Sequence, residues 1–418
     1  MELFKIARVR QLLDDSRLEN VEEAVYQEIE SLGIRGKVSK GDKVAIGAGS
    51  RGITNIERIV KQVVDYLKSL GTAPFIIPAM GSHGGATAEG QLKVLETLGI
   101  TEKYLGCPIQ SSLDVIKEGE SEDGIPVYLD KFAAGADHIV IINRVKSHTF
   151  FHGEIESGLT KMCVIGLGKH KGALAAHSSA VFRIGQHSIL LRRIAQVLRR
   201  NHPLLFGLAI IENAFGETAI IKALAGDEIE KEEPKLLTHA KAISPKLPSD
   251  TLDLLIVDEM GKDISGPGMD RNITGRGIGI SEPKILRIFV RDLTQKSYGN
   301  ATGIGQADFT TTRLVKKIDR KATYANSLTS MIPDSAKIPA YFDSDREALE
   351  AAFMTIDKEA KDIEAVWIKN TSRLAEFYVS ESLLPVIQKR DNLMLESDLQ
   401  PLQFDKEGNL KRERFSFE

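Results

Sequence analysis

The sequence is poor in the features that mark several protein classes. Only two cysteines, Cys107 and Cys163, occur in 418 residues, which excludes a disulfide framework and a cysteine-based zinc site. The longest apolar run, 204–211, is interrupted by Gly207 and is far shorter than the about 20 residues that span a bilayer. The N-terminal stretch MELFKIARVRQLLDDS is charged throughout and lacks the apolar core of a secretory signal.

Net charge is also small. The chain has 55 Lys+Arg against 58 Asp+Glu, so its formal net charge is −3. This balance argues against a protein that holds nucleic acid through its overall charge. We therefore expect a soluble, cytoplasmic protein that binds neither nucleic acid nor a membrane.

The first two-thirds of the chain alternate short β-branched runs with amphipathic stretches, a pattern typical of an α/β fold with a mostly parallel sheet. Strands are expected at 43–47, 74–78, 138–143 and 206–212. Between the first two, apolar residues from 56 to 70 follow helical spacing, and Gly71 stands where a helix C-cap glycine is expected. A second helix, at 190–200, is expected to end before Pro203.

The stretch 240–249 contains two prolines and no clear period, which indicates a domain boundary. A buried strand is expected at 252–260, followed by a glycine-rich segment (261–279), strands at 284–290 and 365–368, and helices around 311–317 and 345–355. We predict two α/β domains with mostly parallel sheets, 1–245 and 246–418, and an active site in the cleft between them. The tail 402–418 is expected to be loose or to fold back onto the first domain.

Residues 47–52 spell G-x-G-x-x-G between an expected strand and an expected helix, the context of a dinucleotide fingerprint. The following strand, however, ends without an acidic residue to hold a ribose. Arg51 inside the loop is a good bidentate partner for a carboxylate. The loop thus favours a carboxylate or phosphate site, with a dinucleotide site or a structural turn as alternatives.

The loop 80–89 places His83 between glycines at the carboxyl end of a strand, where open α/β sheets bind ligands. Glycines on both sides let a substrate approach the imidazole closely. The alternative is an ordinary histidine on a surface loop.

The densest polar segment is 143–177, which holds four of the nine histidines. His148 and His152 would make a metal pair on a helix, but Phe150, Phe151 and Gly153 favour a loop instead. No third ligand completes a zinc set at a familiar spacing. Cys163 lies in an apolar run and is expected to be a core residue rather than a nucleophile.

Together these segments resemble the nickel-dependent lactate racemase family over most of the chain. The resemblance is carried by Ser50-Arg51, the GSHGG loop around His83, the block with His148, Lys161 and His177, and a later element, 269–276. Lys161 and His177 are separated by 16 positions, similar to the spacing of the family's cofactor lysine and nickel histidine.

The resemblance implies a nickel-pincer nucleotide, a pyridinium mononucleotide whose two sulfurs and ring carbon bind nickel. Lys161 would attach it through a thioamide, and His177 would be the fourth nickel ligand. Ser50 and Gly158 would also contact the cofactor. Proteins that synthesise the nucleotide would then be partners in the cell.

The same resemblance assigns His83 as one acid–base group, His148 as the second, with His152 as the alternative, and Arg51 as the clamp for the substrate carboxylate. Family lactate racemases carry tyrosine, glutamine and lysine where this chain has Thr274, Gly275 and Arg276. If these positions face substrate, the pocket is larger and more polar. We therefore expect a longer or hydroxylated 2-hydroxy acid.

The residue types suit inversion at C2 of such an acid. Removing the C2 hydrogen as hydride is easier when a base takes the hydroxyl proton, and the planar keto acid can accept hydride on either face. The hydride acceptor must be a cofactor, because side chains cannot fill that role. Two other functions stay open: an NAD-dependent 2-hydroxy acid dehydrogenase, and a non-catalytic nickel- or anion-binding protein.

Overall fold

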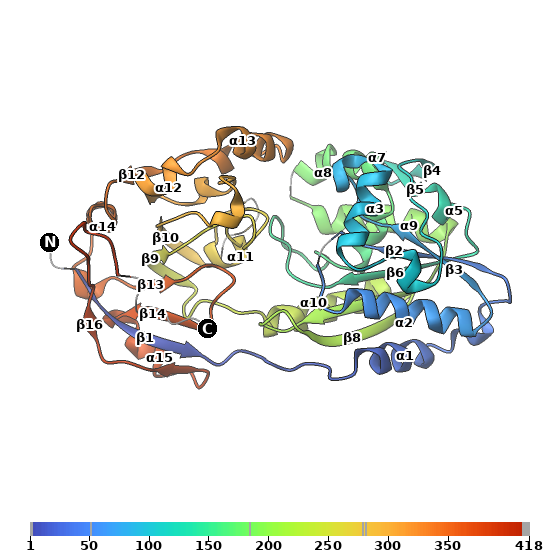
Figure 1. The fold of residues 1–418 in the computed structure, drawn as a ribbon, viewed down its shortest axis with the longest axis horizontal. Helices are drawn as coiled ribbons and strands as arrows, with labels where there is room; N and C mark the ends of the chain where they lie inside the picture. Colours follow the sequence, from blue (N-terminus) through green and yellow to red (C-terminus); the bar gives the residue numbers. More distant parts are fainter. Residues whose placement is uncertain (1–2, 51, 184, 278–279, 281, 412–418) are drawn as a thin grey trace. The chain divides into compact units, whose positions relative to one another are not determined.

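The computed structural model describes residues 3–50, 52–183, 185–277, 280 and 282–411. The chain divides into two compact units. One consists of Asp14–Ser244, and the other combines Met1–Leu13 with Pro245–Glu418. Both combine helices with a sheet, mostly parallel in the 14–244 unit and mixed in the other (Figure 1), which confirms the predicted α/β class.

The 14–244 unit is built on a five-stranded sheet in the order β3-β2-β6-β7-β8. The first four strands run parallel, and β8 pairs antiparallel with β7. The bounds are β2 Lys43–Ala48, β3 Ala73–Pro78, β6 His138–Arg144, β7 Leu204–Glu212 and β8 Thr218–Ala225. The four strands predicted for this region are thus present, each with an end shifted by at most two residues.

Helices cover both faces of this sheet, because successive strand residues point to opposite faces and are buried on both. Val140 and Ile142 pack in one core with helices α1 Val21–Ser31 and α2 Ile56–Ser69. Ile139 and Ile141 point into the other core, with α9 His187–Asn201 and α10 Ile229–Ile243. The predicted helix at 56–70 is α2, and Gly71 after it adopts the left-handed φ of 83° that a C-cap glycine supplies.

A two-stranded antiparallel hairpin, β4 Val115–Glu120 with β5 Pro126–Asp130, is separate from this sheet. The remaining helices of the unit that concern the site are α3 Ala88–Thr97, α5 Lys131–Ala134, α6 Leu159–Lys161, the π-helical turn η3 Met162–Gly166, α7 Lys169–His177 and α8 Ala180–Arg183.

The other unit is built on a nine-stranded sheet in the order β12-β11-β10-β9-β13-β14-β1-β15, with β16 also paired to β1. The strands from β12 to β13 are parallel, and those from β14 onward are antiparallel. Their bounds are β1 Lys5–Gln11, β9 Thr251–Val257, β10 Lys284–Val290, β11 Phe309–Thr311, β12 Ala340–Phe342, β13 Ala365–Ile368, β14 Glu376–Ser380, β15 Leu393–Leu395 and β16 Gln400–Pro401.

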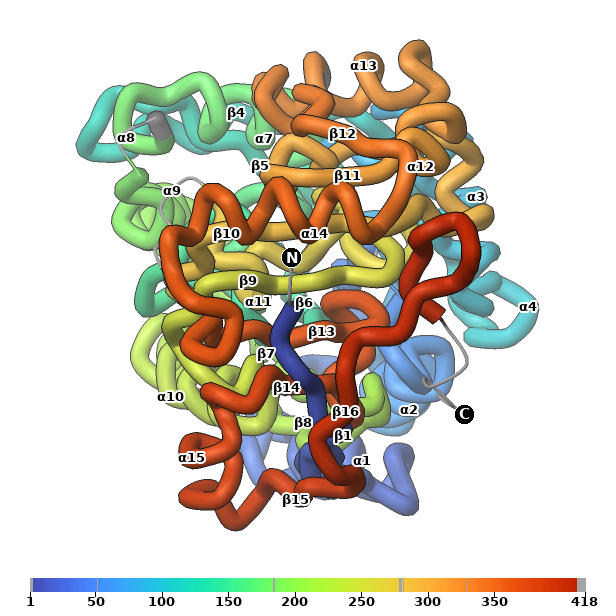
Figure 2. The backbone as a smooth tube through the Cα atoms, turned by 90° about the vertical axis from the view of Figure 1, so that its left-hand side faces the viewer, coloured from blue at the N-terminus to red at the C-terminus, as the bar shows by residue number. Residues whose placement is uncertain are grey.

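Two features differ from the predicted domain limits. The first strand, β1, belongs to the unit of the later residues, where Ile6 and Val9 are buried and pair with Ser380 and Phe377 of β14. The described part of the tail also packs within this unit, because β16 pairs with β1 and Leu410 is buried there. Figure 2 shows β1 beside these late strands.

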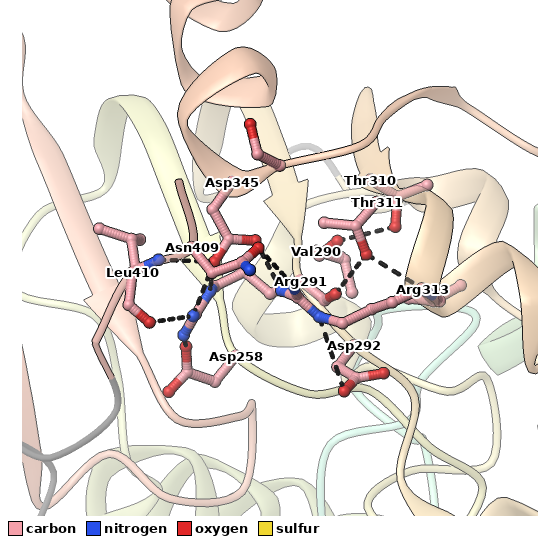
Figure 3. A network of polar contacts seen from close by, with 12 residues as sticks. Asp258, Val290, Arg291, Asp292, Thr310, Thr311, Arg313, Asp345, Asn409 and Leu410 are labelled. Atoms are coloured by element: carbon pink, nitrogen blue, oxygen red, sulfur yellow. Dashed lines mark hydrogen bonds and ion pairs between the residues drawn. The ribbon is translucent and has the colours of Figure 1, made fainter. Parts of the chain in front are cut away.

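A buried ion network ties the tail to the sheet (Figure 3). The Arg291 guanidinium, 1% exposed, pairs with Asp258 after β9 and with Asp345 at the start of α14 Asp345–Met354. Arg291 Nη2 also donates to the carbonyl of Leu410 at 2.7 Å, and the Leu410 amide donates to Asp345 at 2.9 Å. The late segment is therefore fixed to the carboxyl ends of two parallel strands.

Within the residues that the structure describes, none of the helices combines the length and the apolar character that a membrane span needs.

Candidate functional site

The loop that follows β6 carries His148 and is held by a buried carboxylate. Glu156, 1% exposed, accepts hydrogen bonds from the backbone amides of His148 at 2.6 Å and Gly153 at 3.1 Å. Lys241 of α10 pairs with the same carboxylate at 2.5 Å. The segment 147–152 is a loop, as its aromatic and glycine residues predict, so His148 and His152 do not share a helix face.

Five aromatic rings form a continuous series that we call the histidine–phenylalanine ladder. His148 stacks on Phe151 with ring centroids 4.2 Å apart, and Phe151 stacks on His187 at 4.4 Å. His187 meets Phe182 edge-on at 4.1 Å, and Phe182 contacts His177 at 4.8 Å. The ladder links the predicted acid–base histidine at one end to the predicted nickel ligand at the other.

Lys161 acts electrostatically on both ends of this ladder. Its positive charge lowers the pKa of His148 and also the pKa of His177. The side chain is half-buried at the end of α6. The π-helical turn η3 follows directly, and such turns occur frequently at functional sites.

The surroundings of the ladder histidines favour their neutral form. Burial lowers the pKa of His148 strongly, and the charges of Lys161 and His187 lower it further. Burial is also the main cause of the lowered pKa values of His187 and of His177, although His177 is open to solvent on one side. A neutral imidazole has the lone pair that a metal ligand needs.

Hydrogen bonds fix the tautomers of two histidines. His148 Nδ1 accepts from the Phe150 amide at 3.1 Å, so the proton of its neutral ring is on Nε2. His83 Nδ1 lies 2.8 Å from the Met80 carbonyl, which can only accept. The neutral His83 ring therefore carries its proton on Nδ1 and its lone pair on Nε2.

The loops after β2 and β3 pack against the π-helical turn. The Gly81 amide donates to the Gly166 carbonyl at 3.3 Å, which brings the His83 loop beside the segment that follows Lys161. A Cβ on Gly49 would lie 2.7 Å from Met162 Cε, so Ser50 follows a glycine that close packing requires. Ser50 is half-buried, whereas Arg51 lies outside the described residues.

The sequence matches the family described as "Lactate racemase N-terminal domain" over residues 4–188. The matched segment contains His83, His148, Lys161 and His177 as well as His187, so the whole ladder lies within it. His152, the alternative second acid–base residue, is exposed and is not part of the ladder.

A solved structure with a TM-score above 0.5 shows the same fold at low sequence identity. A protein from Thermotoga maritima matches with a TM-score of 0.53 and 13% identity, covering 87% of this chain and 99% of its own. The lactate racemase apoprotein from Thermoanaerobacterium thermosaccharolyticum matches with a TM-score of 0.47 and 13% identity, covering 83% and 91%. A comparison with curated proteins finds no match.

Gly158, at the start of α6, the helix that carries Lys161, is explained by packing. A Cβ there would lie 1.8 Å from Glu233 Oε1, so this side of the backbone holds a protein carboxyl group and not space for a nucleotide. Glu233 Oε2 accepts from the amide of Thr160 at 3.0 Å and from its hydroxyl at 2.5 Å. Burial raises the pKa of Glu233, which favours its neutral form.

The two predicted substrate residues beyond the matched segment 4–188 have partners within their own unit. Thr274 is fully buried and donates to Gln306 Oε1 at 2.7 Å. Arg276 pairs with Asp308 at 2.9 Å and also donates to the carbonyls of Ile285 and Leu286. These contacts give both residues a structural role, and their contact with substrate stays a prediction.

Sequence reasoning missed His187, Phe182, Glu156 and Glu233, all of which hold the site together. His187 had one usable signal, its position at the start of an amphipathic helix ten residues after His177. Among the described residues, no three His, Cys, Asp or Glu side chains gather closely enough to hold a metal by themselves. Cys163 is buried, as predicted, and burial raises its pKa to about 12.

Proposed function

We propose that this protein is a racemase or epimerase that inverts C2 of a 2-hydroxy acid, with a nickel-pincer nucleotide attached to Lys161 and ligated through nickel by His177. The observation that carries the proposal is the position of Lys161, whose charge acts on both His148 and His177 within a lactate racemase N-terminal domain.

The residues present fit this cofactor. Lys161 offers a half-buried amine, and His177 offers a neutral imidazole that is partly open to solvent. A pincer nucleotide would bring donors of its own, so His177 would have to provide only one ligand for the metal. When bound, the cofactor supplies the electron sink that accepts the C2 hydrogen as hydride and returns it.

The side chains would handle the protons and the carboxylate. His83 Nε2 would take the hydroxyl proton as the C2 hydrogen leaves, giving a planar 2-keto acid. For return of the hydrogen to the opposite face, protonated His148 would donate its Nε2 proton to the carbonyl oxygen. Attachment as a thioamide removes the charge of Lys161, which is one of the causes that suppress protonation of His148.

Several parts of the proposal go beyond the described contacts. Arg51 would clamp the carboxylate, and Thr274 and Arg276 would favour a longer or hydroxylated acid over lactate. Proteins that make the nucleotide would be partners of a cytoplasmic enzyme. The exposure of His152 and its place outside the ladder favour His148 as the second acid–base group.

The test is to produce the full chain in cells that make the pincer nucleotide and to measure its intact mass, nickel content and inversion of 2-hydroxy acids. We expect added mass on the peptide with Lys161, lost in Lys161→Met and kept in Lys171→Met, an exposed lysine nearby. His177→Ala should lose nickel, while His170→Ala, exposed on the same helix, should keep it.

Three results would overturn the proposal. Activity that needs added nicotinamide dinucleotide and produces net keto acid would identify a dehydrogenase. Nickel binding without inversion of any acid tested would identify a binding protein. Adduct mass that persists in Lys161→Met would refute the attachment site.

A further inference from the structure

The buried lysine at the start of α7 combines two features that cost free energy. Lys169 is 0% exposed, although its side chain carries an ammonium group. Its φ of 52° also lies in the left-handed region, which residues with a side chain rarely adopt. Strain and a buried charge at one residue are retained where the surrounding structure uses them.

The Lys169 ammonium is surrounded by three acceptors from three elements. It lies 3.0 Å from Asp130 Oδ2 in an ion pair whose partner is also 0% exposed. It donates to the Pro78 carbonyl at 2.5 Å and to Gln91 Oε1 at 3.4 Å. The other Asp130 oxygen accepts from the amides of Phe132 and Ala133, so the carboxylate is anchored at the N-terminus of α5.

The contacts of Lys169 lead to the loop that carries His83. Pro78 is the last residue of β3, immediately before that loop. Because Gln91 Oε1 accepts from Lys169, Nε2 of the same amide points away from Lys169. Gln91 Nε2 donates to the carbonyls of Gly81 at 2.9 Å and His83 at 3.3 Å, and Gln91 is itself 0% exposed.

We propose that Lys169 and Gln91 are positioning residues that set the His83 loop relative to α7, the helix that ends at His177. The ion pair with Asp130 fixes the ammonium, the ammonium orients the Gln91 amide, and the amide holds the backbone of the loop on both sides of Ser82. The Met80 carbonyl, in the same loop, then keeps the proton of His83 on Nδ1. This inference rests on the proposed function, in which His83 Nε2 accepts the substrate proton.

The deciding variant is Gln91→Glu in the full, cofactor-loaded chain. It keeps the acceptor for Lys169 and the length of the side chain but removes the donor to the loop carbonyls. We expect kcat for inversion to fall about 10- to 100-fold, as for small misplacements of a catalytic group, with KM changed less than about twofold. Lys169→Met should have the same effect, and Lys171→Met, an exposed lysine on the same helix, should have none.

A second readout does not depend on activity. In the full chain labelled with ¹⁵N-histidine, the His83 signals, assigned by their loss in His83→Gln, should show the Nδ1–H tautomer. That preference should be lost in Gln91→Glu and in Lys169→Met. Unchanged His83 signals in both variants would overturn the inference, whatever their effect on activity. If the wild-type protein inverts no 2-hydroxy acid, the proposed function fails, and the tautomer measurement alone decides this inference.

Discussion

Acid should destabilise the 14–244 unit through the histidine–phenylalanine ladder. The pKa values of His148 and His187 are lowered in the folded protein, mainly by burial, whereas an unfolded histidine titrates at about 6.5. Above that pH, both states are neutral and no penalty arises. Below it, the unfolded chain binds protons that the folded ladder does not bind, so stability falls as the pH falls.

The size of the effect follows from the two buried rings. Between about pH 7.5 and about pH 5.5, each histidine that stays neutral when folded lowers the free energy of unfolding by about 1.4 kcal/mol. Two such histidines give about 3 kcal/mol, a large share of the 5–15 kcal/mol that is typical of a domain. We leave His177 out of this sum because it is exposed.

Native-state hydrogen exchange of the buried β7 amides at the two pH values measures the opening free energy of this unit. The double variant His148→Phe, His187→Phe keeps aromatic rings in the ladder and removes both titrating groups. Its loss of stability on acidification should be about 3 kcal/mol smaller than that of the wild type. His152→Phe, at an exposed position, is the matched control and should behave as the wild type. Equal losses in the double variant and the wild type would refute the reasoning.

Three more changes have defined outcomes. Lys161→Met should raise the pKa of His148 and of His177, because it removes a positive charge near both rings; NMR titration of the unloaded protein measures this. Arg291→Met should lower the free energy of unfolding by about 3–5 kcal/mol, because it leaves Asp258 without its cation and Asp345 with Arg313 alone; urea unfolding followed by the fluorescence of Trp367, which contacts the same network, measures it. Gly158→Ala should weaken the Lys161 helix, because the new Cβ would lie 1.8 Å from Glu233 Oε1; the thermal midpoint and the yield of the Lys161 adduct report the loss.

Each of these has a control or a result that would contradict it. Unmoved histidine titrations in Lys161→Met would mean that its ammonium does not lie near the ladder. Arg346→Met, an exposed arginine next to the same aspartate in sequence, should change stability little. Gly36→Ala, where an added Cβ meets nothing within 4 Å, should be harmless; equal damage there would show that the Glu233 contact is not the cause.

Local sequence patterns predicted much of the fold and part of the site. The β-branched runs at 43–48 and 138–144 are strands because their residues are buried on both faces of the sheet, which produces continuous apolar runs. Lys161 and His177 were named from the resemblance of one short segment to a known family, and their roles stay predictions. The loop character of 148–152 followed from its aromatic and glycine content.

Other features depend on contacts between distant positions and had no local signal. β1 pairs with β14 about 370 residues later in the register Ile6↔Ser380, and its charged outer residues conceal a buried strand. Glu233 reaches the amide of Thr160 across 73 positions. His187 joins the site only through ring contacts with Phe151 and Phe182, which the spacing of the histidines does not show.

The pairing of β1 with late strands affects how the protein can be made. Because β1 lies in the sheet of residues 245–418, the 14–244 unit is an insertion joined at residues 13 and 245. During synthesis, the inserted unit can complete its own sheet while the ribosome is still translating the rest, since domains generally fold as units as they emerge. β1 cannot pair until β14 has been synthesised, and until then its apolar residues are exposed and can bind other chains. The nine-stranded sheet should therefore form last and should be the part of this protein that most needs protection from aggregation during folding.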